Sequence, residues 1–244
     1  MDEEGFTRVT KGRKLRSVKD SGRVDGTREE VEKAMKRAER RVEEEDGSIV
    51  EWLARKIETA LEGRTLEQVF VVGNGHFDGA SEPGAVQLAI AMRVAERFSS
   101  PVIFQDPACT VAEVEWLEGR RVTVRREAGM RPTEMVAVGP GTSNEEQRCR
   151  LVYFIHNPHG LLEELIREEE GSPRNILVCN DYSTWSEEDY GSSVDGPLPY
   201  LKRFMDRAKV DRLPPSVVCP LSFHGTSLIW IPKDRNIANS QRNC

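Results

Sequence analysis

The stretch QVFVVGNG, residues 68–75, decides the fold of this chain. Valine and phenylalanine follow one another without a polar interruption, and glycines end the run. An unbroken run of this kind is typical of a strand that is buried on both faces, as in a parallel sheet covered by helices. The stretch therefore predicts a central strand of an α/β sheet.

Strands and helices alternate from this strand towards the C-terminus. Pro83 stands where the first turn of a helix tolerates proline, and Thr110 with Glu113 forms a capping box. Further strands are predicted at 101–107, 120–126, 151–157, 175–183, 216–221 and 226–232, and further helices at 84–98, 111–119, 160–170 and 199–208. Such alternation implies right-handed crossovers. We predict a Rossmann-like α/β fold with a mostly parallel sheet and helices on both faces.

Two regions of this domain are less regular. The last strand, 226–232, is predicted to be antiparallel and to lie at an edge of the sheet. Residues 126–150 contain an extra short strand, an insertion or a loop, and the sequence does not decide among these.

Two helices are predicted ahead of the sheet, in residues 27–63. Thr27 with Glu30 forms a capping box for the first helix, and Ser48 with Glu51 forms one for the second. The first helix is highly charged and its apolar stripe is narrow, so we expect it to pack loosely or to project. The domain organisation is then a flexible basic arm at 1–26, the helices at 27–63, the α/β domain at 64–232 and a polar tail at 233–244.

Composition excludes several classes of protein. The chain has 244 residues, a net charge of −6 and a pI of about 5.5, which argues against nucleic-acid binding except through the basic arm. Neither a membrane span nor a secretory signal is present, so we expect a cytoplasmic or nuclear protein. The five cysteines are widely spaced, which makes a disulfide framework or a structural zinc site a poor explanation.

Polar residues follow the predicted strands, and the carboxyl ends of parallel strands form the usual ligand-binding edge of such a sheet. All four histidines of the chain lie just after a predicted strand. Any single polar residue here is most simply a loop residue, but the set favours a binding site. The candidate ligand-binding residues are Asn74, His76, Asp106, His156, His159, Asn180, Asp181 and His224.

The residues alone leave the ligand open. Gly73, Gly75 and Asp106 suggest a nucleotide, although the full G-x-G-x-x-G order is absent. One histidine could be an axial ligand of haem. We assign no metal ligands, because His156 and His159 lack a full ligand set. Cys179 lies inside a strand and is more simply a buried residue than a nucleophile.

In order along the chain, these blocks resemble the sensitivity-to-red-light-reduced (SRR-type) family. The resemblance covers roughly residues 65–232 and runs through GNGHFDGASEPGAVQLAIAMRV, VIFQDPACTVAEVEWLEGRRVTV, VYFIHNPHGLLEELI, NILVCNDYS and LSFHGTSLIWIP. It carries over His156, Asp106 and Asn180. Where the family has Pro-His-Cys, this chain has Ile155 and Asn157 around the histidine, and Cys179 and Asp181 replace the glycine and serine that flank the family's asparagine.

The resemblance implies a biological role more than a reaction. Family members are linked to circadian and phytochrome signalling in plants, to haem metabolism and clock-gene expression in animals, and to microtubule-related phenotypes in fungi. We therefore expect a regulatory, non-enzymatic protein with a small-molecule ligand and regulatory protein partners. The alternatives are an enzyme with a nucleotide-like cofactor at the same edge, and a protein-interaction module built on the basic arm and the charged helix 27–46.

Overall fold

In the computed structural model, residues 25–79, 83–126, 147–168 and 174–233 are described. Most of the predicted basic arm and C-terminal tail, and most of the undecided region 126–150, lie outside these residues. The helices are α1 (Arg28–Glu45), α2 (Gly47–Leu61), α3 (Pro83–Arg97), α4 (Val111–Gly119), α5 (His159–Glu168), α6 (Glu187–Gly191), α7 (Pro199–Met205) and the 3₁₀-helix η2 (Pro220–Phe223). The strands are β1 (Thr65–Val72), β2 (Val102–Gln105), β3 (Thr123–Arg125), β4 (Arg148–Phe154), β5 (Asn175–Asn180), β6 (Lys209–Arg212) and β7 (Thr226–Trp230).

The described strands form one sheet in the order β3-β2-β1-β4-β5-β7-β6. Strands β1 to β5 are parallel to one another, and β7 runs antiparallel to both of its neighbours, β5 and β6. Strands β2 and β3 lie on one side of β1, whereas β4 and all later strands lie on the other side. The switch point of this α/β sheet therefore lies between β1 and β4.

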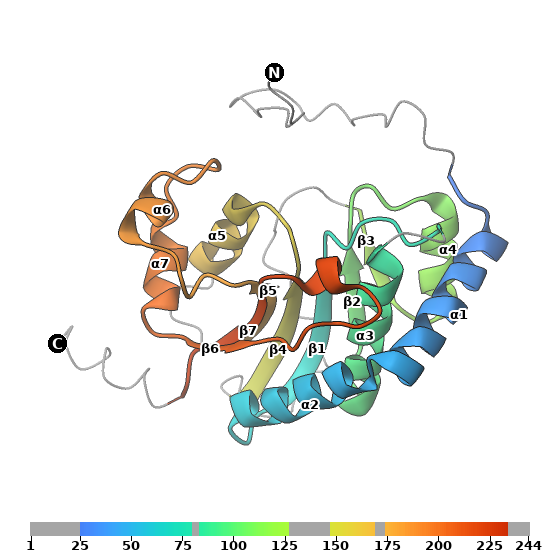
Figure 1. Cartoon of the computed structure of the whole chain (residues 1–244), viewed down its shortest axis with the longest axis horizontal. Helices are drawn as coiled ribbons and strands as arrows, with labels where there is room; N and C mark the ends of the chain where they lie inside the picture. Colours follow the sequence, from blue (N-terminus) through green and yellow to red (C-terminus); the bar gives the residue numbers. More distant parts are fainter. Residues whose placement is uncertain (1–24, 80–82, 127–146, 169–173, 234–244) are drawn as a thin grey trace, which may run out of the picture.

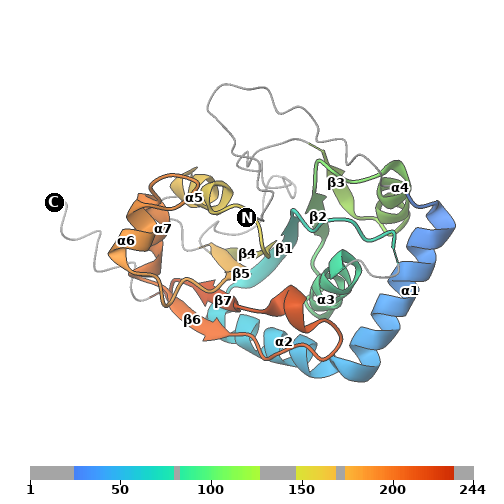
Figure 2. The same ribbon diagram turned by 45° about the horizontal axis from the view of Figure 1, so that its top comes forward.

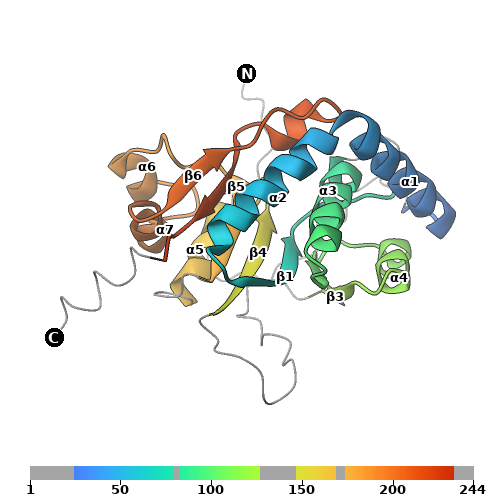
Figure 3. The ribbon, with the colours of Figure 1, turned by 90° about the horizontal axis from the view of Figure 1, so that it is seen from below.

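Alternate residues of β1 face two different cores. Val69 and Val71 belong to a core with residues of α1, α2, α3 and α4, whereas Phe70 and Val72 pack with residues of α5, α6 and α7. Figures 1 and 2 show these two groups of helices on either side of the sheet, and Figure 3 shows α2 lying across the sheet beside α3. The predicted Rossmann-like α/β fold, mostly parallel with helices on both faces, is confirmed.

The expectation that the first helix packs loosely or projects is wrong. Its narrow stripe is almost completely buried, and the helix packs along α3 and α4. Charged residues contribute to this packing, because Glu32 accepts a hydrogen bond from Trp116 Nε1 at 2.6 Å and Glu39 pairs with Arg120 at 3.2 Å. A narrow apolar stripe is therefore enough here, since acidic groups at its border bind Trp116 of α4 and Arg120 directly after it.

The predicted capping box at Ser48 is also wrong, because α2 begins at Gly47 and Asp46 separates it from α1. The Asp46 side chain is used elsewhere. It is buried and accepts hydrogen bonds from the Ser216 hydroxyl, from Val217 N at 2.7 Å and from Val218 N at 3.2 Å. The junction of the two N-terminal helices is thus anchored to a segment far along the chain.

The same contacts explain why the strand predicted at 216–221 does not form. Backbone N–H groups that would join a ladder are bound by Asp46, and Pro220 has no N–H to give. Residues 220–223 instead form η2. The strand that sequence reasoning missed is β6, at 209–212, and it is β6 rather than β7 that forms this edge of the sheet. The antiparallel direction predicted for β7 is confirmed, whereas its predicted place at the edge is wrong.

Among the described helices, none combines the length and the apolar character that a membrane crossing would need.

Replacing Asp46 with alanine should lower the free energy of unfolding by about 2–4 kcal/mol, because three donors lose a charged acceptor in a buried place. Asp46→Asn keeps one acceptor oxygen and should lose less. Urea denaturation measures both changes, with Glu44→Ala, at an exposed position of α1, as the control. Equal stability of Asp46→Ala and the control would show that the anchor contributes nothing.

Candidate functional site

The carboxyl ends of β1, β2, β4 and β5 form the edge of the sheet at which a ligand was predicted, and we call it the carboxyl rim. The structure separates the predicted residues of this rim into two groups and leaves two residues apart. One group, on the β1 and β2 side, contains Asn74, His76 and Asp106. The other, on the β4 and β5 side, contains His156, His159 and Asn180.

Asp106 closes the β1 and β2 side of the rim. Its two carboxylate oxygens accept backbone hydrogen bonds, from Gly75 N and from Ala108 N, each at 2.9 Å. The side chain is buried and ties the loop after β1 to the loop after β2. Each oxygen that would bind a ribose in a nucleotide site therefore already accepts one backbone N–H group, which a ribose hydroxyl would have to join or displace.

Asn74 has a similar role at the start of α3. Its amide nitrogen donates to Gly84 O at 3.0 Å and to Gly75 O at 3.2 Å. Gly84 fits this place because an added Cβ would lie 2.4 Å from His76 O. The buried Asn74 Oδ1, in contrast, has no hydrogen-bond partner among the described residues.

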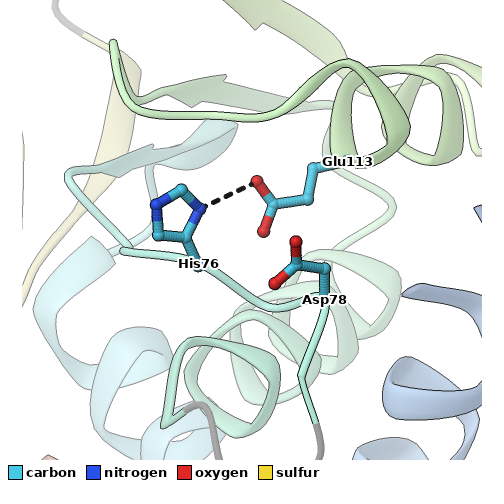
Figure 4. Close-up of side chains that lie close together, drawn as sticks. All are labelled: His76, Asp78 and Glu113. Carbon is cyan, nitrogen blue, oxygen red and sulfur yellow. Dashed lines mark hydrogen bonds and ion pairs between the residues drawn. The ribbon is translucent and has the colours of Figure 1, made fainter. Parts of the chain in front are cut away.

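His76 lies in the same loop and meets two carboxyl groups that sequence reasoning did not assign to a site (Figure 4). His76 Nδ1 lies 3.3 Å from Glu113 Oε2, and Asp78 completes a group of three whose ligand-type atoms all lie within 4.8 Å of one another. Glu113 is fully buried and also accepts hydrogen bonds from Phe77 N at 2.6 Å and Thr110 N at 2.8 Å. We call His76, Asp78 and Glu113 the three-residue cluster.

Sequence reasoning did not identify Glu113 as a site residue, because its part in a capping box already explained its presence. Its capping box with Thr110 is confirmed at the start of α4. The second role requires the loop after β1 to lie against α4, and no local pattern predicts that contact. Asp78 could have been found from its place two residues after His76, since both follow the same strand.

At the β4 and β5 side, His156 is held in an unusual backbone conformation. Its φ of 55° lies in the left-handed region, and its backbone N–H donates to Asn180 Oδ1 at 3.2 Å. The His156 side chain is exposed, although Ile155 before it is buried. Two of the residues predicted from separate strands, His156 and Asn180, are thus in direct contact.

Aromatic side chains that were not predicted as site residues lie beside these residues. His159 Nδ1 is 2.9 Å from the Tyr182 hydroxyl, and the His159 and Tyr182 rings each lie 4.9 Å from the Trp185 ring. Burial lowers the pKa of His159, opposed in part by the charge of Asp195. We call His156, His159, Asn180, Tyr182 and Trp185 the β4–β5 rim.

Asn157 lies at the switch point and separates the two groups. Its amide nitrogen donates to Val72 O at 2.8 Å, across the gap between β1 and β4. Gly73 has a φ of +57°, and a Cβ added there would lie 1.8 Å from Asn157 Oδ1. The crevice in which Rossmann-like proteins commonly bind a ligand is therefore occupied here by an asparagine side chain.

Asp181 and His224 belong to neither group. Asp181 accepts a hydrogen bond from Arg212 Nε at 2.6 Å and one from Ser183 N at 2.9 Å. Burial works to raise the pKa of Asp181, but these hydrogen bonds outweigh it and the pKa lies below its usual value. His224 is exposed and follows η2, not the strand that was predicted before it.

Buried thiol and phenol groups near the rim are not activated. Burial raises the pKa of the Cys179 thiol far above its usual range, and it does the same for the Tyr182 hydroxyl. Cys109 is raised as well, by burial and by the charges of Glu113 and Asp106. The interpretation of Cys179 as a buried residue of a strand is confirmed by its full burial.

Gly73→Ala should destabilise the protein by about 2–4 kcal/mol, because a Cβ would clash with Asn157 at a left-handed φ. Gly75→Ala is the matched control, since its φ of +73° carries the same backbone strain but nothing lies within 4 Å of the added Cβ. Urea denaturation should show the larger loss for Gly73→Ala. In the double variant with Asn157→Ala, the loss of stability should be smaller than the sum of the losses of the two single variants. A loss equal to that sum would contradict the clash.

The depressed pKa of His159 predicts a pH dependence. In the unfolded chain, His159 has its ordinary pKa of 6.5 and takes up a proton below that pH, whereas in the folded chain it still resists protonation. The free energy of unfolding therefore falls as the pH falls from 6.5 towards the lower pKa of the folded protein. Above that window, His159 has no effect on the pH dependence. His159→Gln does not titrate, and it should lose less stability than the wild type between about pH 7.5 and pH 5.5, as measured by urea denaturation. Equal losses would show that His159 is not responsible.

Comparison with known proteins now gives the family. The model of the SRR1 domain matches residues 38–230, from within α1 to the end of β7. No protein with a curated description matches the sequence. One solved structure, a mutant of MtNAS in complex with S-adenosylmethionine, is similar with 12% identity and a TM-score of 0.38, over 82% of this chain and 72% of that chain. That likeness is too low to bear on function. The SRR1 match covers most of the chain, and the chain therefore belongs to the SRR1 domain family.

Proposed function

We propose that this protein is a regulatory, non-enzymatic member of the SRR1 domain family that binds a small ligand at the β4–β5 rim. The observation that carries the proposal is the exposed imidazole of His156 on a backbone of positive φ, held there by Asn180. A left-handed conformation costs a residue other than glycine about 1–2 kcal/mol. Among the described residues, the other non-glycine residues with a positive φ lie just after helices (Glu62, Ser99 and Arg121). His156 instead follows a strand at the carboxyl rim, and strain of this kind clusters at active sites and ligand-binding sites.

The neighbouring side chains support a planar, partly aromatic ligand. The half-buried rings of His159, at the start of α5, and Trp185 lie against each other beside His156, and the buried Tyr182 ring packs against both. Ring edges and faces bind planar ligands by stacking, and the His159 ring supplies a hydrogen-bonding nitrogen. Such a surface combines apolar contact with a few polar groups, as small-molecule sites do.

Haem is one ligand of this class, and the donor set fits it in one respect. Histidine is a common axial ligand of haem iron, and the imidazole of His156 is exposed. Haem would supply the redox or gas-sensing chemistry of its iron, while the chain would supply the axial nitrogen and the aromatic neighbours. The link of the family to haem metabolism makes haem the first probe to use.

A nucleotide-like cofactor receives less support from the geometry. Asn157 occupies the switch point, and both oxygens of Asp106 accept backbone hydrogen bonds. A nucleotide in the usual position would have to replace these interactions with its own. Because the thiol of Cys179 and the hydroxyl of Tyr182 have raised pKa values, neither is a ready nucleophile for an enzyme.

We further propose that ligand binding serves regulation in the cytoplasm or the nucleus, with regulatory proteins as partners. This part rests on the family membership and on the kinds of process with which the family is linked, light and clock signalling and haem metabolism. The exposed, charged side of α1 offers a surface for such partners, since its buried side already packs on α3 and α4.

His156→Gly tests the proposal because it should change stability and binding in opposite directions. Glycine adopts a positive φ without strain, so the variant should be more stable by about 1 kcal/mol. It also lacks the imidazole, so it should no longer bind the ligand. Native mass spectrometry of gently purified protein, with and without added haem, measures binding, and urea denaturation measures stability.

His224→Ala is the control, because it removes another exposed imidazole that lies outside the β4–β5 rim. The wild type and this control should carry the same extra mass, while His156→Gly and His156→Ala should not. If the wild type carries no extra mass, including after addition of haem or nucleotides, the ligand-binding proposal is wrong and the protein-interaction alternative takes its place. Retention of the mass by both His156 variants would also contradict it.

A further inference from the structure

We propose that the three-residue cluster, His76, Asp78 and Glu113, is a binding site for a divalent transition-metal ion. This site is separate from the β4–β5 rim and does not depend on the function proposed for it. The two carboxyl groups and the imidazole come from the loop after β1 and from α4, and Figure 4 shows all three turned towards one common space.

The distances suit a shared ion. The ligand-type atoms of the three side chains all lie within 4.8 Å of one another. Two ligands bound to one ion at about 2.0–2.2 Å stand roughly 3–4 Å apart, so small side-chain movements would complete the coordination. The distance of 3.3 Å between His76 Nδ1 and Glu113 Oε2 already lies in that range.

Burial makes a cation favourable at this place. Glu113 is 0% exposed and Asp78 is 6% exposed, so two carboxyl groups face each other away from water. In the described part of the chain, the ion pair of Glu113 is with His76, which is charged only when it is protonated. Asp106, a third buried carboxylate, holds the same loop through Gly75. A divalent ion is attracted more strongly to carboxyl groups gathered in such a buried place than to carboxyl groups in water.

Backbone groups already orient the proposed ligands. Glu113 accepts hydrogen bonds from Phe77 N and Thr110 N, and Asp78 Oδ2 accepts one from Gly26 N at 2.8 Å. In metal sites, hydrogen bonds of this kind fix the direction of carboxylate ligands before the ion arrives. Three separate segments, the residues before α1, the loop after β1 and the start of α4, therefore converge on the site.

The donor set indicates which ions fit. One imidazole nitrogen and two carboxylate oxygens suit Zn²⁺ or Mn²⁺, whereas Mg²⁺ and Ca²⁺ prefer oxygen ligands alone. Three protein ligands leave at least one coordination position for water or for an oxygen-donor ligand. The His76 side chain is 22% exposed, so this open position can reach solvent at the carboxyl rim.

The same residues could have a purely structural role without a metal ion. The variant Glu113→Gln distinguishes that role from a metal site. Glutamine can serve in a capping box as glutamate does, so the helix cap and one backbone contact remain. The negative charge and most of the metal affinity are lost. Asp78→Asn is the second such variant, because the asparagine oxygen can still accept the hydrogen bond from Gly26 N.

The experiment uses the full chain after treatment with a chelator and exchange into metal-free buffer. Zn²⁺ and Mn²⁺ are titrated separately by calorimetry, and native mass spectrometry gives the number of ions bound per chain. The wild type should bind one ion, and so should His224→Ala and His156→Gly. The affinities of His76→Ala, Asp78→Asn and Glu113→Gln should each be weaker by about 100-fold or more, because loss of a direct ligand should cost at least as much as loss of an outer-shell partner.

Thermal unfolding without metal checks that the three variants are folded. At least one of Asp78→Asn and Glu113→Gln should be folded, because each keeps the shape of the side chain that it replaces. No stoichiometric binding of either ion to the wild type would overturn the proposal. Equal binding by the wild type, Asp78→Asn and Glu113→Gln would overturn it as well. The role of the cluster would then be structural, to cap α4 and to hold the loop after β1. Because His156→Gly should keep its ion, failure of the ligand proposal at the β4–β5 rim would be seen separately.

Discussion

The burial of β1 on both faces is the constraint on which the rest of this structure depends. Successive side chains of this strand enter two different cores, so helices cover both faces of the sheet. The connections between the parallel strands supply these helices. The order of the strands, the switch point between β1 and β4, and the place of the carboxyl rim all follow from that requirement. The N-terminal helices serve it too, since α1 and α2 complete one of the two cores.

Buried side chains, not backbone pairing, hold the loops of the rim in place. Asp106 and Glu113 each accept two backbone N–H groups, and Asp46, directly before α2, does the same. Each of them joins segments that are distant in sequence, so the loops are fixed relative to one another before any ligand arrives. Asn157 divides the rim, and the two groups of polar residues on either side of it have different chemistry: carboxylates on one side and aromatic rings on the other.

The sequence predicted the features that depend on local pattern. Apolar runs located β1, β2, β4 and β5, and the capping boxes at Thr27 and Thr110 are present as predicted. The errors come from contacts between distant residues. A strand at 216–221 was favoured by its valines, but Asp46 captures the backbone donors, and the edge strand β6 is too short and too charged to give a strand signal.

The same limit applies to the site. That polar residues follow the strands was predictable, but the hydrogen bond from His156 N to Asn180 was not. The pairing of His76 with Glu113 was not predictable, because the two residues are 37 positions apart and Glu113 already had a local explanation. Sequence pattern identifies the residues at the carboxyl rim, but only the folded chain shows which of them share a space.

The edge strand β6 has a consequence for how copies of this protein behave together. It has four residues, and three of them, Lys209, Asp211 and Arg212, are charged. Lys56 and Asp181 pair with two of these charges from within the same chain. A strand from another molecule that tried to extend the sheet here would find few backbone groups to bind and would have to displace ion pairs. At this end the sheet is therefore closed to growth, and crowded solutions of the folded protein should resist aggregation through that edge.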